Sequence, residues 1–331
     1  MVKIGLLGVG HLGKVHLKCL QEINSIEIIG FFDPDETGAT AITLKYPSIR
    51  RFDSAEALID QSDAIDIVTP TVTHFELAEK AIKKKKHVFI EKPLTQTPEE
   101  ALTLIQLAQK YKVCVQVGFV ERFNPAFLSI QHLPLNPMFI EAHRLSLFNP
   151  RGTDVSVVLD LMIHDLDLIL SLIKAPLASI NASGVSVVSS SPDIANARLE
   201  FKNGAVANLT ASRISLKQMR KLRIFQKEAY ISLNLLNKEA QIVRLFNEKE
   251  KHKLSNKNMI SLETEKGKKY IDIEQTQAPS GNAIKMELEA FTNTILQEKP
   301  SILSIEEAYL SLKVAHQISH KITERSSVFS S

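Results

Sequence analysis

The chain has 331 residues, of which 44% are hydrophobic and 23% charged, and its formal net charge at pH 7 is +3. This length exceeds what one hydrophobic core usually serves, so we expect two domains. The near balance of acidic and basic residues gives no electrostatic argument for a nucleic-acid partner, and no window holds the roughly 20 apolar residues that a membrane span needs.

Strands and helices alternate over the first third of the chain. The capping box Thr97-Pro98-Glu99-Glu100 opens a helix that we expect to run to Ala108. Strands separated by helices imply right-handed βαβ crossovers and a doubly wound parallel sheet, which makes residues 1–120 a Rossmann domain in an α/β fold. The expected buried strands are 3–7, 27–32, 64–68, 87–90 and 113–117, and further helices are expected at 11–23 and 74–84.

After about Gly118 the pattern changes to that of an α+β domain, residues 121–331, with a large open and mainly antiparallel sheet. One very apolar helix is expected at 157–173, and two helices close the chain, the second opened by the capping box Ser304-Ile305-Glu306-Glu307. The lysine-rich segment 247–269 is expected to form edge strands and loops, because lysine protects sheet edges. The expected strands are 180–188, 195–201, 205–213, 221–226, 231–236 and 241–246.

The two cysteines, Cys19 and Cys114, lie in apolar surroundings without the spacing of a metal site or a CxxC motif. The apolar stretch 4–7 near the N-terminus is too short for the core of a signal peptide and is followed by glycine, so we interpret it as a strand. We therefore expect a cytoplasmic protein with buried thiols and no bound metal.

The sequence Gly8-Val9-Gly10-His11-Leu12-Gly13 follows the first expected strand and opens the first expected helix. In this context a GxGxxG motif is typical of a dinucleotide-binding turn. Gly8 permits the tight turn, Gly10 lets a pyrophosphate approach the backbone, and Gly13 lets the helix pack on the strand. The amides near His11 and Leu12 would then hold the pyrophosphate at the helix N-terminus.

Asp33 lies 20 residues beyond Gly13, at the end of the second expected strand. A carboxylate at this point suits the ribose 2′-hydroxyl of NAD and repels the 2′-phosphate of NADP, so the expected cofactor is NAD. The alternative is a purely structural turn in which Asp33 caps the next helix.

The expected helix at 157–173 carries Asp160, His164, Asp167 and Ser171 at spacings of i, i+4, i+7 and i+11, which places them on one face. Unpaired buried charge is costly, so a polar stripe on an otherwise apolar helix indicates a function. The alternatives are a face that meets solvent, or a core histidine, His164, that Asp160 satisfies.

The tripeptide Glu91-Lys92-Pro93 follows the fourth expected strand, at the end where ligands of open α/β sheets bind. Lys92 would then project toward the cofactor, and the bond before Pro93 is a candidate for a cis peptide that directs the lysine. Taken by itself, Lys92 is also compatible with an ordinary surface lysine.

Together these features resemble the Gfo/Idh/MocA oxidoreductases, the relatives of glucose–fructose oxidoreductase and inositol dehydrogenase. The resemblance spans the Rossmann domain and the first half of the second domain, and it implies the same open sheet that the strand pattern indicates. The motifs that carry it are, in chain order, Gly8-Val9-Gly10-His11-Leu12-Gly13 with His16, Phe32-Asp33-Pro34-Asp35, Thr69-Pro70-Thr71 with His74, His87-Val88 running into Glu91-Lys92-Pro93, and Asp160-Leu161-Met162-Ile163-His164-Asp165.

The resemblance implies that Lys92, Asp160 and His164 form the catalytic set of an NAD-dependent dehydrogenase. Two positions depart from the family, which often has glycine where Lys85 and Met162 stand. Lys85 is then a left-handed helix end with a local cost of at most about 1 kcal/mol, and Met162 crowds the floor of the pocket. The resemblance also places a set of residues along the cofactor, namely Thr69, Pro70, Thr71, His74, Glu91 and Lys92.

Within the family, the segments Val120-Glu121-Arg122-Phe123-Asn124-Pro125-Ala126 and Val157-Val158-Leu159-Asp160 resemble one branch. That branch is the sugar-nucleotide 3-dehydrogenases, which oxidise C3 of UDP-N-acetylglucosamine or its uronate. A diphosphate substrate needs cations, for which Arg122 and Arg144 are the candidates, although Arg122 also suits a structural ion pair. The residues expected on the substrate side are Arg122, Asn124, Arg144 and Asp167.

In the expected reaction, hydride leaves carbon for the nicotinamide while a base removes the hydroxyl proton. His164 is the first candidate for the base, oriented by Asp160, with Lys92 stabilising alkoxide charge; a lysine of lowered pKa is the other candidate. A polyol or inositol dehydrogenase and a non-catalytic NAD-binding regulator are the alternative functions. Apolar residues on both sides of strand segments 231–236 and 185–188 predict a homodimer or homotetramer that packs sheet to sheet.

Overall fold

The computed structural model describes residues 1–148, 155–227, 229–253, 260–265, 267–276, 281–299 and 301–329. These residues divide into two compact units, each with its own sheet. The first unit comprises Met1–Phe123 and Gly281–Lys313, and the second comprises Asn124–Ser280 and the chain from Val314 onward. The units therefore do not follow a single cut after residue 120, because the segment that begins at Gly281 packs with the first sheet.

The first unit is built on a parallel sheet with strand order β2-β1-β3-β4-β5, which confirms the predicted Rossmann topology. The order reverses between β1 and β3, so the loops that follow these two strands flank the switch point at which open α/β sheets bind ligands. The strands are β1 (Val2–Leu7), β2 (Ile26–Phe32), β3 (Ala64–Ile67), β4 (His87–Glu91) and β5 (Val115–Gly118). The helices are α1 (His11–Gln21), α2 (Glu36–Lys45), α3 (Ala55–Gln61), α4 (His74–Lys83), α5 (Pro98–Tyr111) and α8 (Ala283–Gln297), with the short turns η1 (Thr71–Thr73) and η2 (Val120–Phe123).

Helix α8 comes from the last quarter of the chain but completes the core of the first unit. Its Leu288 and Phe291 pack with Ile4, Leu20 and Phe89 in one buried hydrophobic cluster. The rings of Phe89 and Phe291 meet edge to face, with centroids 5.8 Å apart, which is a favoured aromatic geometry. A helix from the C-terminal part of the chain thus covers a sheet that the N-terminal part forms.

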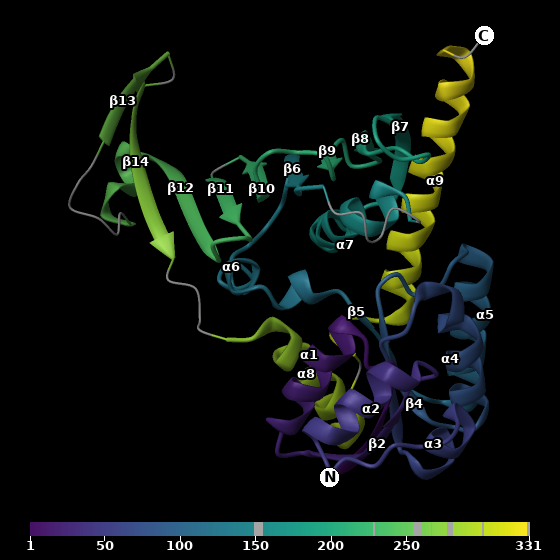
Figure 1. The fold of residues 1–331 in the computed structure, drawn as a ribbon. Coiled ribbons are helices and arrows are strands. Elements are labelled where there is room, and N and C mark those ends of the chain that lie inside the picture. The colour runs from purple at the N-terminus through teal and green to yellow at the C-terminus, as the bar shows by residue number, and fades with distance from the viewer. Residues whose placement is uncertain are drawn as a thin grey trace. The chain divides into compact units, whose positions relative to one another are not determined.

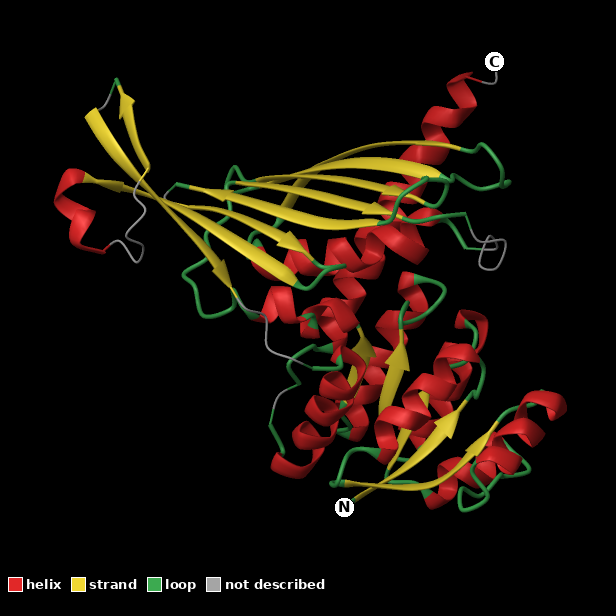
Figure 2. Ribbon diagram, turned by 60° about the vertical axis from the view of Figure 1, so that its left-hand side comes forward, coloured by secondary structure: helices red, strands yellow, loops and turns green. Residues whose placement is uncertain are grey.

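The second unit is built on a nine-stranded sheet in the order β13-β14-β12-β11-β10-β6-β9-β8-β7. Every described neighbouring pair is antiparallel except β6–β9, so the predicted open and mainly antiparallel sheet is confirmed. Helices α6 and α7 lie against one face of it (Figures 1 and 2). The strands are β6 (Phe139–Leu145), β7 (Leu177–Val185), β8 (Ile194–Phe201), β9 (Val206–Ser212), β10 (Met219–Gln226), β11 (Ala229–Asn234), β12 (Glu239–Asn247), β13 (Ile260–Thr264) and β14 (Gly267–Thr276). The remaining elements are α6 (Pro125–Leu128), η3 (Val158–Met162), α7 (Ile163–Leu172), η4 (Glu248–Lys253) and α9 (Ile305–Phe329), which runs from the first unit into the second.

The predicted apolar helix at 157–173 forms as two segments, the π-helix η3 and the α-helix α7. A π-helical turn holds more residues than an α-helical one and is frequent at functional sites. The wider turn changes the spacing of 3.6 residues per turn on which the predicted alignment of the polar residues rests. Asp160 and His164 are half-buried, whereas Asp167 is only 1% exposed, so the polar stripe is not one uniform face.

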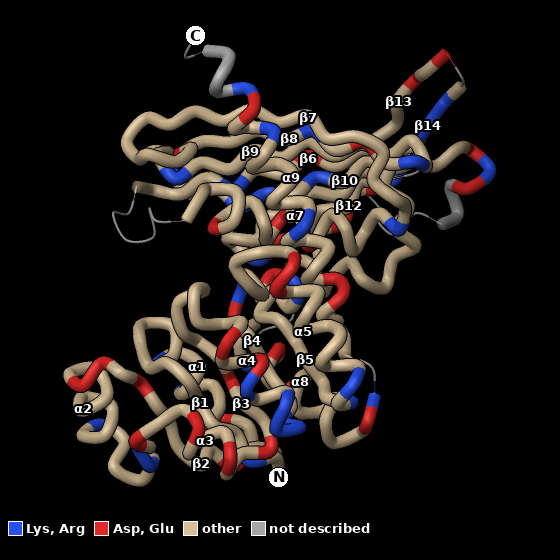
Figure 3. Tube along the Cα trace, turned by 90° about the vertical axis from the view of Figure 1, so that its right-hand side faces the viewer, with Lys and Arg blue, Asp and Glu red and all other residues tan. Residues whose placement is uncertain are grey.

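Charge is mixed along both units. In the view of Figure 3, lysine and arginine residues alternate with aspartate and glutamate residues on each unit. Of the lysine-rich segment 247–269, residues 254–259 and 266 lie outside the described residues, and the rest forms η4, β13 and the ends of the adjoining strands. Among the helices that the structure describes, none is long and apolar enough to cross a membrane.

Lys85 follows helix α4 in the left-handed conformation, with φ at 59°, as the sequence predicts. Its side chain is exposed, and its N–H donates to the carbonyl of Ile82 (2.8 Å). We expect Lys85→Gly to raise the free energy of unfolding by about 1 kcal/mol, because glycine adopts a positive φ without a Cβ clash. Lys85→Ala is the matched control, since it removes the same side chain but keeps the Cβ. Equal stability of the two variants in urea unfolding would contradict the prediction.

Candidate active site

The three glycines of the loop after β1 have different surroundings. A Cβ on Gly8, whose φ is +92°, would lie 2.5 Å from the carbonyl oxygen of Val68, and a Cβ on Gly13 would lie 2.1 Å from that of Gly8. By contrast, no described atom lies within 4 Å of a Cβ built on Gly10. The tight turn and the helix packing therefore account for Gly8 and Gly13, while Gly10 leaves the backbone open to an approaching group.

Helix α1 begins at His11, directly after this loop. No side chain within the described residues caps the helix at Gly10, and its first turn holds no acidic residue. The side chains of His11 and Leu12 are exposed. Uncapped N–H groups at the positive end of the helix dipole favour an anion, so the residues present fit the diphosphate of a dinucleotide.

Asp33 follows β2 and accepts two backbone hydrogen bonds. The N–H of Val9 donates to its Oδ2 (2.7 Å) and the N–H of Asp35 to its Oδ1 (2.9 Å), so the carboxylate is tied to the glycine-rich loop. The side chain that caps α2 is that of Asp35, which accepts from the N–H groups of Thr37 and Gly38. The capping alternative for Asp33 is thereby removed, and its half-buried carboxylate retains lone pairs for a ribose hydroxyl.

The loop after β3 is fixed from inside by His74. This side chain is buried, and its Nε2 and Nδ1 each lie 2.9 Å from a carbonyl oxygen, that of Thr69 and that of Pro93 respectively. Burial lowers the pKa of His74. The buried ring of His74 therefore connects the loop after β3 to the loop after β4. In the loop after β3, Pro70 is exposed and Thr69 and Thr71 are half-buried.

Strand β4 ends at Glu91, and the peptide bond between Lys92 and Pro93 is cis, as predicted. Lys92 is half-buried, but Glu91 is only 7% exposed. Glu91 Oε1 lies 3.1 Å from His16 Nε2, and its Oε2 accepts from the N–H of Lys92 (3.1 Å). A Cβ on Gly118 would lie 2.7 Å from Glu91 Oε1, so a glycine on β5 leaves the room for this carboxylate. Both oxygens of Glu91 are thus used inside the unit.

In the second unit, Asp160 lies in η3 and His164 one turn later, in α7. Both side chains are half-buried, and the N–H of Asp160 donates to the carbonyl of Ser156 (2.9 Å). This helical segment therefore places an imidazole and a carboxylate one turn apart. Such a pair is suited to accepting and holding a proton.

Two residues expected on the substrate side are used within the second unit. Arg144 on β6 is 3% exposed, and its Nε and Nη2 donate to the two carboxylate oxygens of Asp165 (3.1 and 2.7 Å). Asn124 caps α6 by accepting from the N–H of Ala126, and its Nδ2 donates to the carbonyl of Leu235 (2.9 Å). We therefore leave Arg144 and Asn124 out of the substrate site.

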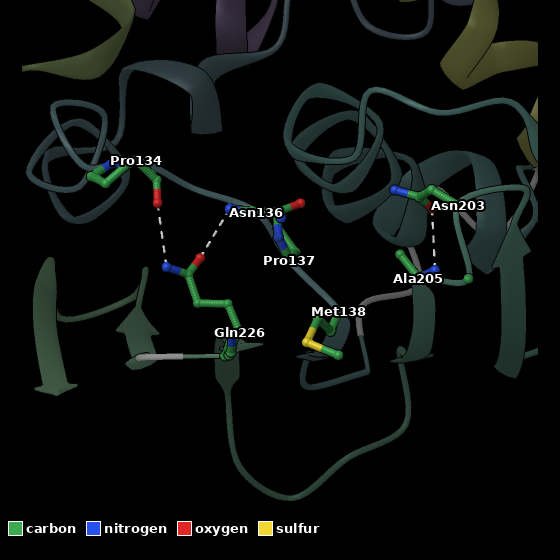
Figure 4. A pocket seen from close by; sticks show the side chains of 9 residues that line it. Pro134, Asn136, Pro137, Met138, Asn203, Ala205 and Gln226 are labelled. Atoms are coloured by element: carbon green, nitrogen blue, oxygen red, sulfur yellow. Dashed lines mark hydrogen bonds between the residues drawn. The ribbon is translucent and has the colours of Figure 1, made fainter. Parts of the chain in front are cut away.

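A pocket of about 790 Å³ lies elsewhere in the second unit, at the ends of β6 and β10 and at the turn between β8 and β9 (Figure 4). The amide of Gln226 donates to the carbonyl of Pro134 (3.3 Å) and accepts from the N–H of Asn136 (3.0 Å). Among the described residues that line the pocket, Lys227 is the one ionisable residue, and none is a predicted site residue. This pocket offers no set of groups for acid–base chemistry.

The parallel sheet of the first unit, with its open diphosphate loop at the N-terminus of α1, defines a dinucleotide-binding domain. Residues 2–119 match the oxidoreductase family with an NAD-binding Rossmann fold, and residues 141–232 match the GFO/IDH/MocA C-terminal domain. The UDP-N-acetylglucosamine 3-dehydrogenase of Acidithiobacillus ferrooxidans is 39% identical over 242 residues, which cover 73% of this chain and 76% of that protein.

Solved structures agree with this match. A structure of the same Acidithiobacillus ferrooxidans enzyme aligns with a TM-score of 0.85 over 97% of both chains, at 33% identity. The NAD⁺-dependent scyllo-inositol 2-dehydrogenase of Bacillus subtilis, compared by sequence, is 29% identical over 235 residues, which cover 65% of this chain and 68% of that protein. The chain belongs to the Gfo/Idh/MocA family of NAD-binding oxidoreductases, and its cofactor is NAD.

Proposed function

We propose that this protein is an NAD-dependent dehydrogenase that oxidises a secondary hydroxyl of a sugar, at C3 of a UDP-N-acetylglucosamine-type substrate. The observation that carries the proposal is the 39% identity, over most of the chain, to a UDP-N-acetylglucosamine 3-dehydrogenase. Inositol dehydrogenases are similar over a smaller share of the chain and at lower identity. The proposed location is the cytoplasm, where the two free cysteine thiols would persist.

In the proposed reaction, NAD held at the glycine-rich loop after β1 and at Asp33 would supply the hydride acceptor. His164 removes the hydroxyl proton, since an imidazole titrates near neutral pH, and Asp160 one turn earlier orients the ring. Lys92, directly after β4, donates a hydrogen bond to the reacting oxygen and stabilises the negative charge that develops there. Asp167 is only 1% exposed, so it is left out of the substrate site together with Arg144 and Asn124.

The test is the appearance of NADH absorbance when the purified protein is mixed with NAD and single candidate substrates. UDP-N-acetylglucosamine or its uronate should support NAD reduction, and myo-inositol and free glucose should not. Turnover of myo-inositol without any response to UDP-sugars would assign the protein to the polyol dehydrogenases instead.

A diphosphate substrate needs a cation, and Arg122 is the remaining candidate. Its side chain is 11% exposed, and its Nη2 lies 4.0 Å from Glu307 Oε2, which is the outer limit of an ion pair. Arg122→Ala should therefore raise the KM for UDP-N-acetylglucosamine more than it lowers kcat. Glu307→Gln is the control, because it removes the partner of Arg122 but keeps the guanidinium.

The preference for NAD over NADP is assigned to Asp33. Its half-buried carboxylate is fixed by two backbone N–H groups, so it cannot turn away from a 2′-phosphate without losing both bonds. We expect NADH to bind at least about tenfold more tightly than NADPH, which corresponds to about 1.4 kcal/mol. Asp33→Ser should narrow this ratio, as measured by cofactor fluorescence titration. Tighter binding of NADPH to the wild-type protein would overturn the assignment.

We further propose that the protein is a homodimer or homotetramer assembled through the open face of the large sheet. In segment 231–236, Ile231, Leu233 and Leu235 are buried, and of the other residues only Leu236 is an exposed apolar side chain. In segment 185–188, the three valines are exposed. Further support comes from one register row that runs across six strands on the open face. Its members are half-buried or exposed apolar residues: Val206, Phe139, Phe225, Tyr230, Val243 and Ile273.

The aromatic rings of this row contact one another. Phe139 and Phe225 meet edge to face with centroids 5.7 Å apart, and the rings of Phe225 and Tyr230 are tilted with centroids 4.9 Å apart. An exposed apolar surface of this kind is usually an interface. Light scattering should give a dimeric or tetrameric mass, and the double variant Phe225→Lys/Tyr230→Lys should shift it toward the monomer. Leu44→Lys, at an exposed apolar residue of α2 in the first unit, is the control. A monomeric mass of the wild-type protein at micromolar concentration would contradict the assembly.

A further inference from the structure

Four ionisable side chains meet in the interior of the first unit. His16 comes from α1, Asp66 from β3, Glu91 from the end of β4 and Glu287 from α8. Their exposed fractions are 0%, 1%, 7% and 0%. Buried ionisable groups are costly unless they are paired or neutral, so the cluster must hold a defined number of protons. The proposed proton transfer to His164 involves none of these four groups.

His16 bridges two of the carboxylates. Its Nδ1 lies 2.9 Å from Asp66 Oδ2, and its Nε2 lies 3.1 Å from Glu91 Oε1. A neutral imidazole has one N–H and can donate to only one ionised carboxylate, whereas the imidazolium donates to both. Burial opposes the charge, but the attraction and hydrogen bond of Asp66, followed by those of Glu91, raise the pKa of His16 well above its ordinary value of 6.5.

Glu287 is the fourth member, and its surroundings differ from those of the other two carboxylates. Within the described residues neither of its carboxylate oxygens has a hydrogen-bond partner. The amide of Gln116 donates to the backbone carbonyl of Glu287 instead (3.0 Å). Phe291, one turn further along α8, meets the ring of Phe89 edge to face, so the neighbourhood is apolar. Burial, followed by the nearby charge of Glu91, raises the pKa of Glu287 well above its ordinary value of 4.5.

The balance of charge decides which member is neutral. One imidazolium between two ionised carboxylates leaves a net charge of −1. Ionisation of Glu287 would add a second negative charge, which no donor among the described residues stabilises. Arg122, on the neighbouring turn η2, lies against Glu307. The elements that pack against α8 are α1, β1, β4, β5 and η2. Their titratable and charged groups are the buried His16 and Cys19 and the exposed His11, Lys14 and Lys18 on α1, the exposed Lys3 on β1, the half-buried His87 and the buried Glu91 on β4, and Glu121 and Arg122 on η2, while β5 contributes the neutral Gln116.

We propose that Glu287 is a neutral carboxylic acid beside a His16 imidazolium that bridges Asp66 and Glu91, and that this cluster positions the turn from Glu91 to Lys92. Glu91 connects the cluster to that turn, because its Oε1 faces His16 and its Oε2 accepts from the N–H of Lys92. His16 lies on α1, the helix whose N-terminus is assigned to the diphosphate. The cluster thus couples the helix at the cofactor loop to the backbone of the proposed catalytic lysine. Glu287 and His16 are positioning residues, and only their kinetic consequence rests on the proposed function.

Infrared spectroscopy tests the protonation state directly. The carbonyl stretch of a neutral carboxyl group is separate from the bands of an ionised carboxylate, so the wild-type protein near pH 8 should show it. Labelling with [¹³C]glutamate should shift the band, which separates glutamate from Asp66 without any variant. Glu287→Gln should abolish the band, and Glu289→Gln, the same change two residues later on α8, should keep it. The absence of the band, or its insensitivity to the glutamate label, would overturn the proposal.

Stability against pH gives a second readout. Because the pKa of Glu287 is raised in the folded chain, its contribution to stability is fully present below its unfolded pKa of 4.5 and is lost as the pH rises through the folded value. The raised pKa of His16 acts in the same direction above 6.5. Glu287→Gln should therefore gain stability over the wild type as the pH rises, and Glu289→Gln should follow the wild type. If the difference in free energy of unfolding between Glu287→Gln and the wild type stays constant from about pH 5 to about pH 9, Glu287 is not a neutral acid in the folded protein.

The kinetic readout tests positioning. Glu91→Gln keeps the size of the side chain and an acceptor for the N–H of Lys92 but removes the charge that faces His16. We expect kcat to fall by about 10²-fold, the scale of a small misplacement of a reacting group, with NADH affinity nearly unchanged. An unchanged kcat would remove the positioning role. If no sugar is oxidised at all, the proposed function is wrong. The infrared and stability measurements would still show whether Glu287 is neutral.

Discussion

Lys92→Ala and His164→Ala should each lower kcat by about 10²- to 10⁴-fold, the range found when a general base or a charge-stabilising donor is removed. Both side chains are half-buried rather than packed in a core, so their truncation should leave the free energy of unfolding close to that of the wild type. NADH affinity should also change little, because the diphosphate loop after β1 and the carboxylate of Asp33 are untouched. The expected signature is a loss of turnover in a folded, cofactor-binding protein.

Single-turnover measurement of NADH formation, with cofactor titration and urea unfolding in parallel, separates this outcome from a folding defect. His132→Ala is the control, because His132 is an exposed histidine of the same unit. The pH profile distinguishes the two roles: without His164 the acidic limb of kcat should disappear, whereas without Lys92 the limb should remain at a lower plateau. If His164→Ala keeps most of its activity, the base lies elsewhere and the imidazole has a structural role.

The first sheet could be read from the sequence because its strands are buried on both faces. Such strands appear as short apolar runs, and each run at 3–7, 27–32, 64–68 and 87–90 lies within one or two residues of the observed strand. The reasons given for Gly8 and Gly13 could also be predicted, since they are steric and local, and both are borne out by the close contacts that a Cβ would make.

The orientation of Glu91 and His74 could not be predicted in the same way. Both belong to motifs that the resemblance places along the cofactor, yet their hydrogen bonds point inward, to groups 75 residues away in the case of Glu91 and His16. Sequence patterns describe which face of an element is polar, but they do not identify a partner on a distant element. The membership of α8 in the first unit was missed for the same reason, because an amphipathic helix does not specify which sheet it covers.

The π-helical turn at Asp160 and strand β14 show two further limits. The spacing i, i+4, i+7 assumes 3.6 residues per turn throughout, so a local change of period cannot be seen in it. Strand β14 begins with Gly267 and two lysines, residues that favour a turn or a sheet edge, and its pairing with β12 is a non-local contact. In both cases tertiary structure overrides a correct local pattern.

Arg144→Met should destabilise the second unit by about 3–5 kcal/mol, the cost of removing one partner of a buried ion pair. The guanidinium of Arg144 is held by both oxygens of Asp165, and the two side chains are 3% and 4% exposed, so the variant leaves a buried carboxylate without its cation. The double variant Arg144→Met/Asp165→Leu should recover most of this loss, because well-packed apolar residues often replace a buried pair at little cost. Urea unfolding of the full chain measures both.

The same pair bears on the proposed base, because Asp165 directly follows His164 and fixes α7 to β6. The double variant should therefore fold but turn over more slowly than the wild type, with the KM for UDP-N-acetylglucosamine nearly unchanged, since the orientation of His164 changes and no substrate contact is lost. The opposite result would restore Arg144 to the substrate site: a single variant as stable as the wild type, with a strongly raised KM and an unchanged kcat. A loss of stability with an unchanged KM would mean that Arg144 orients His164 through Asp165. A raised KM with unchanged stability would mean that Arg144 binds the diphosphate of the sugar nucleotide.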